Sequence, residues 1–338
     1  MKILLDIGHP CEVHVFKNFI WEMQKKGHII KITSRSKDIS NTLLELYNFE
    51  YTNLSKPSEN ILGMIWEFFY RGYKLYRIAK KFKPDILMGA VGVTVSPIGK
   101  LLRKPVFLFY DTEIIPIFNI LSYPLATYVC TPDCHTKDIG KNQVKYNGYK
   151  ELAYLHPKRF TPDESVINKI GLKKEEKFFV LRFVSWKTID HMRGHGIGDK
   201  KKFIESLEAY GKVLITSETP LSTELEKYRL NLKFDEIHHL MAFATMVIGE
   251  SPTMATEAAV LGVPAVYISN SWRGYTNQLE SKYGLVYNFN TEDKALSKII
   301  ELLNDKDLKK KWGEKREIML QDKLDVTAWM VNFVESKT

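Results

Sequence analysis

Short apolar runs alternate with amphipathic stretches from the start of the chain to about residue 130. The runs predict strands, and the stretches between them predict helices because their apolar positions recur at the spacing of a helix face. Strands are expected at residues 2–8, 28–34, 85–90, 106–110 and 127–130, and helices at 14–26, 38–47, 60–82 and 95–102. Strands separated by helices predict a parallel sheet covered on both faces.

The same pattern begins again after residues 149–163, which we interpret as an ordered linker. The second half predicts strands at 178–184, 212–217 and 246–249, and helices at 200–210, 236–244, 291–303, 305–320 and 326–334. The chain is therefore expected to form two doubly wound, Rossmann-like α/β domains that face each other across a ligand cleft. Residues 1–150 would form the first domain, with the C-terminal helix 325–338 as a candidate addition to it, and residues 151–324 the second.

The segment 249–269 says most about function. It reads as a strand end, a tight loop, a short helix and a new apolar strand. Ser251 and Thr253 are good N-cap residues, and a helix start behind a parallel strand attracts anions because its dipole and its N–H groups act together. Glu257 follows one turn along the same helix face, about 6 Å up the axis. Phosphate at the loop and a carboxylate above it suit a nucleotide, although a βαβ helix with a surface glutamate is the plainer alternative.

Polar residues also follow two strands of the first domain. His9 and His14 come after the first strand, at the edge where open α/β sheets bind ligands, and either could act as a base. The alternative is two ordinary polar residues, one of them capping the next helix. Asp111 and Glu113 follow strand 106–110 and suit general acid and base chemistry, or else they cap the helix that comes next.

The second domain carries further candidates for ligand binding. Arg182 lies inside strand 178–184, where an unpaired charge is costly, so it should meet either an anion or an internal carboxylate. The loop after this strand is long for a simple connection and contains Ser185 and His191. Ser217 ends the next strand at the same edge of the sheet.

Composition narrows the classes of protein. The 338 residues suffice for two domains, and 44% hydrophobic with 26% charged residues is typical of globular proteins. The three cysteines have no metal-ligand spacing, so we expect reduced thiols and neither a disulfide framework nor a zinc site. No metal and no bound cofactor are expected. No signal peptide or long apolar span is recognisable, which predicts a cytoplasmic protein. The lysine runs behind the net charge of +9 lack a nucleic-acid-binding motif, so no nucleic-acid partner is expected.

Residues 60–83 mix aromatic and basic side chains. We favour a helix that faces the core and has a basic outer face. The alternative is a helix that makes peripheral contact with a membrane, where the excess positive charge would favour an anionic surface. Nothing in the sequence indicates an oligomeric state.

Three motifs together resemble the two-domain glycosyltransferase-B superfamily, and within it the non-hydrolysing UDP-N-acetylglucosamine 2-epimerases and an uncharacterised related family. The motifs are Lys83-Pro84-Asp85 at the opening of a strand, Asp111-Thr-Glu113 followed by Asn119 and the stretch 126–132, and Glu257-Ala-Ala-Val-Leu-Gly-Val-Pro264. The resemblance implies that Glu257 holds the ribose of a nucleotide sugar while Ser251 and Thr253 cradle its diphosphate.

Two departures from the family pattern bear on the activity. Glu250-Ser251-Pro252 stands where superfamily members often have glycines, and a carboxylate beside a diphosphate is unfavourable unless it turns away. The epimerase motifs of the first loop and of the loop after the first strand of the second domain are missing. Gly8-His-Pro-Cys-Glu12 and residues 182–187 stand in their places.

We therefore expect an enzyme, a metal-independent glycosyltransferase that moves a sugar from a nucleoside diphosphate of the UDP type to a hydroxyl acceptor. The second domain would hold the donor, and His14, Asp111 or Glu113 on the acceptor side would deprotonate the acceptor. One alternative is a UDP-sugar 2-epimerase reaction. Another is a non-catalytic protein that binds sugar nucleotides or polyanions.

Overall fold

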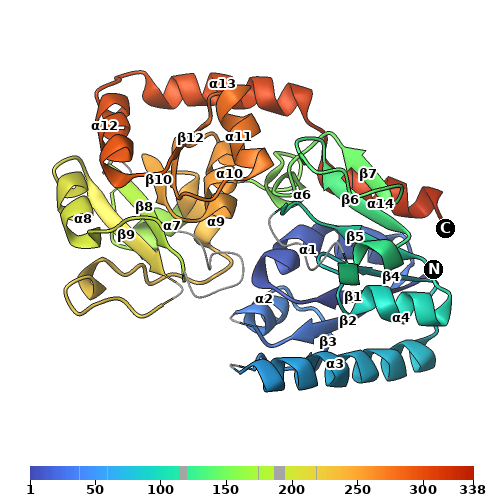
Figure 1. Cartoon of the computed structure of the whole chain (residues 1–338). Helices are drawn as coiled ribbons and strands as arrows, with labels where there is room; N and C mark the ends of the chain where they lie inside the picture. The colour runs from blue at the N-terminus through green and yellow to red at the C-terminus, as the bar shows by residue number, and fades with distance from the viewer. Residues whose placement is uncertain (38, 59, 114–119, 174, 186–194, 218) are drawn as a thin grey trace. The chain divides into compact units, whose positions relative to one another are not determined.

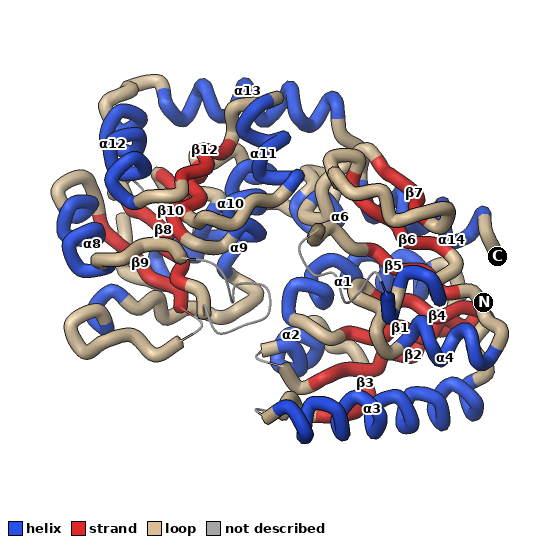
Figure 2. Tube along the Cα trace, in the orientation of Figure 1, coloured by secondary structure: helices blue, strands red, loops and turns tan. Residues whose placement is uncertain are grey.

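The computed structural model describes the chain except for residues 38, 59, 114–119, 174, 186–194 and 218. The chain forms two compact units. Unit 1 comprises Met1–Tyr154 and Leu324–Thr338, and unit 2 comprises Leu155–Lys323. Each unit contains one parallel sheet with helices packed on it (Figures 1 and 2).

The sheet of unit 1 has seven parallel strands in the order β3-β2-β1-β4-β5-β6-β7. They are β1 (Lys2–Ile7), β2 (Ile29–Arg35), β3 (Tyr51–Ser55), β4 (Ile86–Gly89), β5 (Val106–Phe109), β6 (Tyr128–Pro132) and β7 (Gln143–Tyr146). The helices are α1 (Pro10–Lys25), α2 (Ser40–Leu46), α3 (Ile61–Phe82), α4 (Val95–Leu102), η1 (Tyr123–Leu125), α6 (Leu152–Leu155) and α14 (Val326–Ser336).

The central strands of unit 1 are continuous apolar runs because a parallel sheet is buried on both faces. Every residue of β4 and β5 is buried, and so is every residue of β1 after Lys2. Helix α1 contacts α2 and α14, whereas α3 contacts α4, so two groups of helices cover the sheet (Figure 1).

The sheet of unit 2 has five parallel strands in the order β12-β11-β10-β8-β9. They are β8 (Phe178–Phe183), β9 (Lys212–Ser217), β10 (Met246–Gly249), β11 (Ala265–Ile268) and β12 (Val286–Phe289). The helices are α7 (Ser165–Lys169), α8 (Lys200–Glu208), η2 (Glu226–Tyr228), α9 (Ile237–Met241), α10 (Pro252–Leu261), α11 (Gly274–Ser281), α12 (Glu292–Leu303) and α13 (Leu308–Asp322).

The predicted fold class, two doubly wound α/β sheets, is confirmed. The start of the helix expected at 14–26 was wrong. Helix α1 begins at Pro10, because the His9 side chain accepts from a first-turn N–H group and proline suits the first turn of a helix. The segment interpreted as a linker contains the short helix α6. A ligand cleft between the two domains stays a prediction.

Strand order places one switch point in each unit, where successive strands move off in opposite directions. In unit 1 it lies between β1 and β4, and in unit 2 between β8 and β10. Open α/β sheets bind ligands beyond the carboxyl ends of the strands at such points. The segments that follow β1, β8 and β10 are therefore the first places to look for function.

Candidate functional site

The switch point of unit 2 brings two strand ends together backbone to backbone. Gly249 at the end of β10 is the register partner of Arg182 in β8. Its φ is +146°, and a Cβ atom there would lie 2.3 Å from the Arg182 carbonyl oxygen. Only glycine fits at this position, because any side chain there would collide with the backbone of β8.

Helix α10 begins at this turn. Ser251 is its N-cap residue, and the Ser251 Oγ accepts from the Met254 N–H at 3.3 Å. Pro252 occupies the first position, where its missing N–H costs nothing. A helix start placed here presents backbone N–H groups and the positive end of the dipole at the carboxyl edge of the sheet.

The side chain of Glu250, whose charge would oppose phosphate binding, is directed to the connection between β8 and α8. It is buried, its Oε2 accepts from the Val184 N–H at 3.0 Å, and its Oε1 accepts from the Ile197 N–H at 2.9 Å. Gly196 lies close beside it, so that a Cβ atom there would lie 2.3 Å from Oε1 and would displace the carboxylate. The carboxylate is thus bound by backbone N–H donors of the β8–α8 connection and is not directed to the start of α10.

Glu257 lies one turn along α10 and is buried rather than on the surface. Its Oε1 shares a 2.9 Å hydrogen bond with Nε2 of His238, a buried residue of α9. The imidazole fixes the position of the carboxylate. Glu257 is therefore not the surface glutamate that the plainer interpretation of the sequence expected. A buried carboxylate with a fixed orientation is suited to bind two neighbouring hydroxyl groups.

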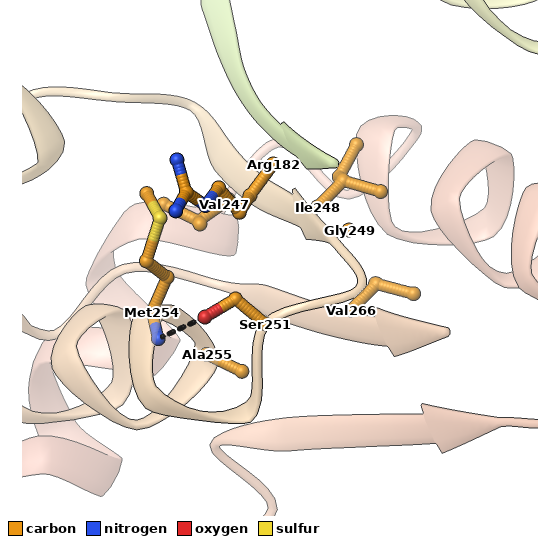
Figure 3. A pocket seen from close by; sticks show the side chains of 8 residues that line it. All are labelled: Arg182, Val247, Ile248, Gly249, Ser251, Met254, Ala255 and Val266. Carbon is orange, nitrogen blue, oxygen red and sulfur yellow. Dashed lines mark hydrogen bonds between the residues drawn. The ribbon is translucent and has the colours of Figure 1, made fainter. Parts of the chain in front are cut away.

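The Arg182 side chain lines a small hollow between β8, β10 and α10, together with Ser251 and Met254 (Figure 3). The hollow is too narrow for a water molecule, so it is a packing gap and no ligand cavity. Arg182 therefore borders the start of α10. Its predicted contact with an anion is not tested by this geometry.

The remaining candidates of unit 2 lie near the same sheet edge or cannot be placed. Ser217 ends β9, and its Oγ accepts from the Thr219 N–H at 3.3 Å. Thr253 is half-buried in the first turn of α10, and Ser185 is half-buried just after β8. His191 lies outside the described residues. For all four, a role in binding stays a prediction.

In unit 1, the turn after β1 is organised by the side chain of Glu12. This buried carboxylate accepts from the Gly8 N–H at 2.8 Å. Burial raises the pKa of Glu12 to about 7, against the lowering effect of the Gly8 N–H and of Arg71. A carboxyl group with this pKa can exchange a proton near neutral pH, which is what a general base requires.

A buried ion pair lies beside the turn after β1. Arg71 of α3 donates to Asp6 of β1 at 2.7 Å, both side chains are buried, and the Thr33 hydroxyl donates to Asp6 at 2.8 Å. Asp6 also raises the pKa of Glu12 by charge repulsion. The pair therefore fixes α3 to the strand end and contributes to the electrostatics of the turn.

His9 and His14 have different environments. His9 is the N-cap residue of α1; its Nδ1 accepts from the Cys11 N–H at 3.3 Å and lies 3.1 Å from the Cys11 thiol sulfur. His14 is buried inside α1, where it shares a 3.1 Å hydrogen bond with the Tyr47 hydroxyl and stacks on Tyr154. The packing of His14 is that of a core histidine, and a catalytic role for either residue stays a prediction.

The two carboxylates after β5 are both buried. Asp111 pairs with Lys150 at 2.8 Å. Glu113 Oε1 accepts weakly from the Thr136 N–H at 3.4 Å, and its Oε2 has no hydrogen-bond partner among the described residues. A cap for a following helix cannot be assessed, because residues 114–119 are not described.

The carboxyl ends of β1 and β5 are electrostatically linked. Burial raises the pKa of the Cys11 thiol to about 12; Lys150 lowers it, and Glu12, Asp111 and Glu151 raise it further. These groups therefore lie close enough to influence one another at one edge of the unit 1 sheet. The structure pairs Asp111 with Lys150, and it places Glu12 where, like these two residues, it acts on the Cys11 thiol. The sequence singled out neither Glu12 nor Lys150.

Sequence reasoning missed Glu12, Lys150 and His238 as members of the candidate sites. Glu12 had a usable signal, since an acidic residue in the first turn of a helix after a βα turn lies at the ligand edge of the sheet. Lys150 and His238 had none, because each meets its carboxylate through packing between segments far apart in the sequence. Within the described part of the chain, no cluster of three or more His, Cys, Asp and Glu side chains could hold a metal ion.

The fold is one that is found in enzymes of two classes. Two units of this kind form the fold of GT-B glycosyltransferases and UDP-GlcNAc 2-epimerases. The UDP-GlcNAc 2-epimerase of Neisseria meningitidis, solved with UDP-GlcNAc, matches with a TM-score of 0.67 at 13% identity, over 95% of this chain and 99% of that chain. The glycosyltransferase SsfS6 of Streptomyces sp. SF2575 matches with a TM-score of 0.59 at 10% identity, over 99% of each chain. The predicted resemblance in fold is confirmed.

The chain belongs to the DUF354 family, described as "Protein of unknown function (DUF354)", which matches residues 1–335. The uncharacterized protein MJ0665 of Methanocaldococcus jannaschii is 23% identical over 279 residues, which cover 79% of this chain and 81% of that protein. The UDP-N-acetylglucosamine–N-acetylmuramyl-(pentapeptide) pyrophosphoryl-undecaprenol N-acetylglucosamine transferase of Streptococcus pyogenes serotype M6 is 26% identical over 277 residues, 75% of this chain and 71% of that protein. The relatives with a named activity are thus enzymes.

Proposed function

We propose that the protein is a glycosyltransferase that takes a sugar from a nucleoside diphosphate of the UDP type and transfers it to a hydroxyl acceptor without a metal ion. The observation that carries the proposal is the start of α10. It lies at the switch point of unit 2, the Glu250 carboxylate is bound elsewhere, and Glu257 is fixed one turn further along. The Streptococcus pyogenes relative is named as a transferase of N-acetylglucosamine from UDP-N-acetylglucosamine.

The donor would bind to unit 2. Its diphosphate would lie on the N–H groups of Ser251 and Thr253, and its ribose hydroxyls would donate to Glu257, which His238 positions. Arg182, Ser185, Ser217 and His191 are the remaining candidates for contacts to the donor. A helix start can stabilise the leaving diphosphate, so the proposal needs no metal.

The acceptor would be activated on unit 1. We add Glu12 to the predicted bases, because its pKa of about 7 leaves a large ionised fraction at neutral pH. His9, His14, Asp111 and Glu113 keep their predicted roles as alternatives. Lys150 would hold Asp111 in place through its 2.8 Å ion pair.

The second candidate function is a UDP-sugar 2-epimerase reaction, with Asp111 and Glu113 as acid and base. The observation in its favour is that both carboxylates are buried at one strand end, and that Glu113 Oε2 lacks a hydrogen-bond partner among the described residues. The fold fits both reactions equally, since solved structures of both classes match.

The two reactions are separated by following UDP-GlcNAc by NMR with the full-length protein. A transferase releases UDP when a panel of hydroxyl acceptors is added and leaves the donor unchanged without them. An epimerase produces the 2-epimer without any acceptor. Binding of UDP with no turnover under either condition would leave a non-catalytic nucleotide-binding protein.

The ribose contact is tested by Glu257→Gln, which keeps the size of the side chain but removes its charge. UDP affinity measured by calorimetry should fall at least about tenfold, because hydrogen bonds to a charged group contribute about 1.5–3 kcal/mol. Glu314→Gln, an exposed glutamate of α13 in the same unit, should bind UDP as the wild type does. Unchanged affinity in Glu257→Gln, with its melting temperature retained, would refute the assignment of Glu257.

A further inference from the structure

Helix α3 presents a row of large apolar side chains to solvent. Leu62, Ile65, Trp66, Phe69 and Tyr73, which we call the outer stripe, are 81%, 51%, 71%, 65% and 58% exposed. Their spacing of three and four residues places them along one side of the helix. Exposed aromatic residues scattered singly are normal, but a continuous row of this kind marks an interaction surface.

The opposite side of α3 is fully used in holding the helix to unit 1. Glu67, Arg71, Leu75 and Ala79 are buried at four-residue intervals. Glu67 pairs with Arg35 through two 2.7 Å hydrogen bonds, and Arg71 pairs with Asp6. These ionic contacts fix the rotation of the helix about its axis, so the outer stripe cannot turn inward without breaking buried ion pairs.

The charged residues of α3 outside its buried side have one sign. Residues 61–83 include a single acidic residue, Glu67, and it is on the buried side. The basic residues of the helix and its C-cap, apart from the buried Arg71, are half-buried or exposed: Lys74, Arg77, Lys80, Lys81 and Lys83. Three of them lie over aromatic rings of the same helix, Lys74 over Tyr70, Arg77 over Tyr73 and Lys80 over Tyr76.

We propose that the outer stripe docks on an anionic membrane surface, with α3 lying in the plane of the headgroups. The apolar N-terminal half would insert its aromatic rings among the headgroups, and the basic C-terminal half would bind lipid phosphates. A second copy of the chain is a poorer occupant, because two α3 helices would bring like charges together. Among the helices that the structure describes, none is long and apolar enough to cross a membrane, so the contact would be peripheral.

Flotation of the full-length protein with phosphatidylcholine vesicles, with and without phosphatidylglycerol, tests the proposal. The protein should bind the anionic vesicles, bind neutral ones weakly, and dissociate as salt is raised. Trp66→Ser with Phe69→Ser should weaken binding about tenfold for each side chain. The matched control is Trp272→Ser with Ile318→Ser, which removes two exposed apolar side chains of unit 2 and should leave binding unchanged.

The charge contribution is tested separately. Arg77→Gln, Lys80→Gln and Lys81→Gln together should weaken binding about a hundredfold, at about fivefold for each charge near an anionic surface. The same loss of charge at Lys306, Lys309 and Lys310 of unit 2 should have little effect. Equal losses in both charge variants would show binding through net charge alone and overturn the assignment to α3.

Two further outcomes would overturn the proposal. One is the absence of binding to anionic vesicles. The other is a dimer, measured by light scattering, that Trp66→Ser with Phe69→Ser converts to a monomer. That result would identify the outer stripe as an interface between copies of the chain. None of these outcomes depends on the proposed glycosyl transfer, since the readout is binding to lipid without any nucleotide.

Discussion

The raised pKa of Glu12 contributes a pH dependence to the stability of unit 1. Burial raises its pKa from 4.5 to about 7. Between these two pH values the folded protein keeps a proton that the unfolded chain has lost, so stability falls as pH rises through this window. The full difference amounts to about 3 kcal/mol.

We therefore expect Glu12→Gln to gain stability relative to the wild type as pH is raised from 5 to 8, because glutamine can still accept from the Gly8 N–H but never ionises. Melting temperatures of both proteins across this range measure the effect. Glu50→Gln changes an exposed glutamate of the same unit and should show no such trend. A constant difference between Glu12→Gln and wild type at all pH values would contradict the raised pKa.

At Glu250, the sequence could not predict which groups bind the side chain. The expectation that a carboxylate at this position opposes phosphate binding was sound chemistry. Its outcome depends on two backbone N–H groups, of Val184 and Ile197, that belong to another connection. Residue types predict what a side chain needs, whereas the tertiary structure decides which segment supplies it.

At the scale of the element, Gly249 is required by the packing of β10 against β8. Gly249→Ala places a Cβ atom 2.3 Å from the Arg182 carbonyl oxygen at a φ of +146°. Since the clash is with backbone, we expect a loss of about 2–4 kcal/mol in the free energy of unfolding, measured by urea titration. UDP binding should weaken as well, because the turn into α10 must move.

The control for this substitution is Gly313→Ala in α13 of the same unit. No atom lies within 4 Å of the Cβ that this change would add. Alanine there should stabilise the protein by about 0.5–1 kcal/mol, since glycine is the poorer residue inside a helix. Equal effects of the two substitutions would show that the β8–β10 contact is looser than the structure indicates.

The strands were predictable where both faces are buried, because their sequences are then continuous runs of apolar residues. The central strands β1, β4, β5, β8, β10 and β11 were predicted within a few residues of their observed bounds. The strands that were missed, β3, β7 and β12, are all edge strands with few buried residues. An edge strand faces solvent on one side and has no obligatory apolar run, so its sequence resembles that of a loop.

The candidate sites were predictable in the same way, from the places where strands end. Strand ends locate ligand sites in parallel sheets, which is why the sequence alone points to Asp111, Ser251 and Glu257. The buried partners of these residues, Lys150 and His238, were not predictable. Nothing periodic in the sequence connects them to the carboxylates that they contact.

At the scale of the whole molecule, the path of the chain is what joins the two units. After α13 the chain leaves unit 2, and residues 324–338 belong to unit 1. Asn18 of α1 and Thr327 of α14 both donate to the carbonyl oxygen of Ala153, at 2.8 Å and 2.7 Å. Unit 1 is thus completed by α14, which is distant in the sequence from the other elements of the unit, and the stability of unit 1 depends on this helix.

Trp329 is the residue through which this dependence can be measured. Its ring packs against Tyr146 at 4.9 Å, Phe333 at 5.0 Å and Phe109 at 6.3 Å, so α14 contacts both β5 and β7 through it. Trp329→Ala should destabilise unit 1 by about 2 kcal/mol or more. Hydrogen exchange followed by mass spectrometry should show faster exchange in β5 and β6.

The same variant should leave exchange in β8 and β10 unchanged, because those strands belong to unit 2. Trp272→Ala, which removes an exposed ring of unit 2, is the control and should alter neither set of strands strongly. UDP, if it binds to α10 as proposed, should slow exchange in β10 in both variants and leave β5 as it was. If Trp329→Ala raised the exchange rates of β5 and β10 equally, the two units would unfold together as one cooperative body. The two compact units would then have no separate stabilities.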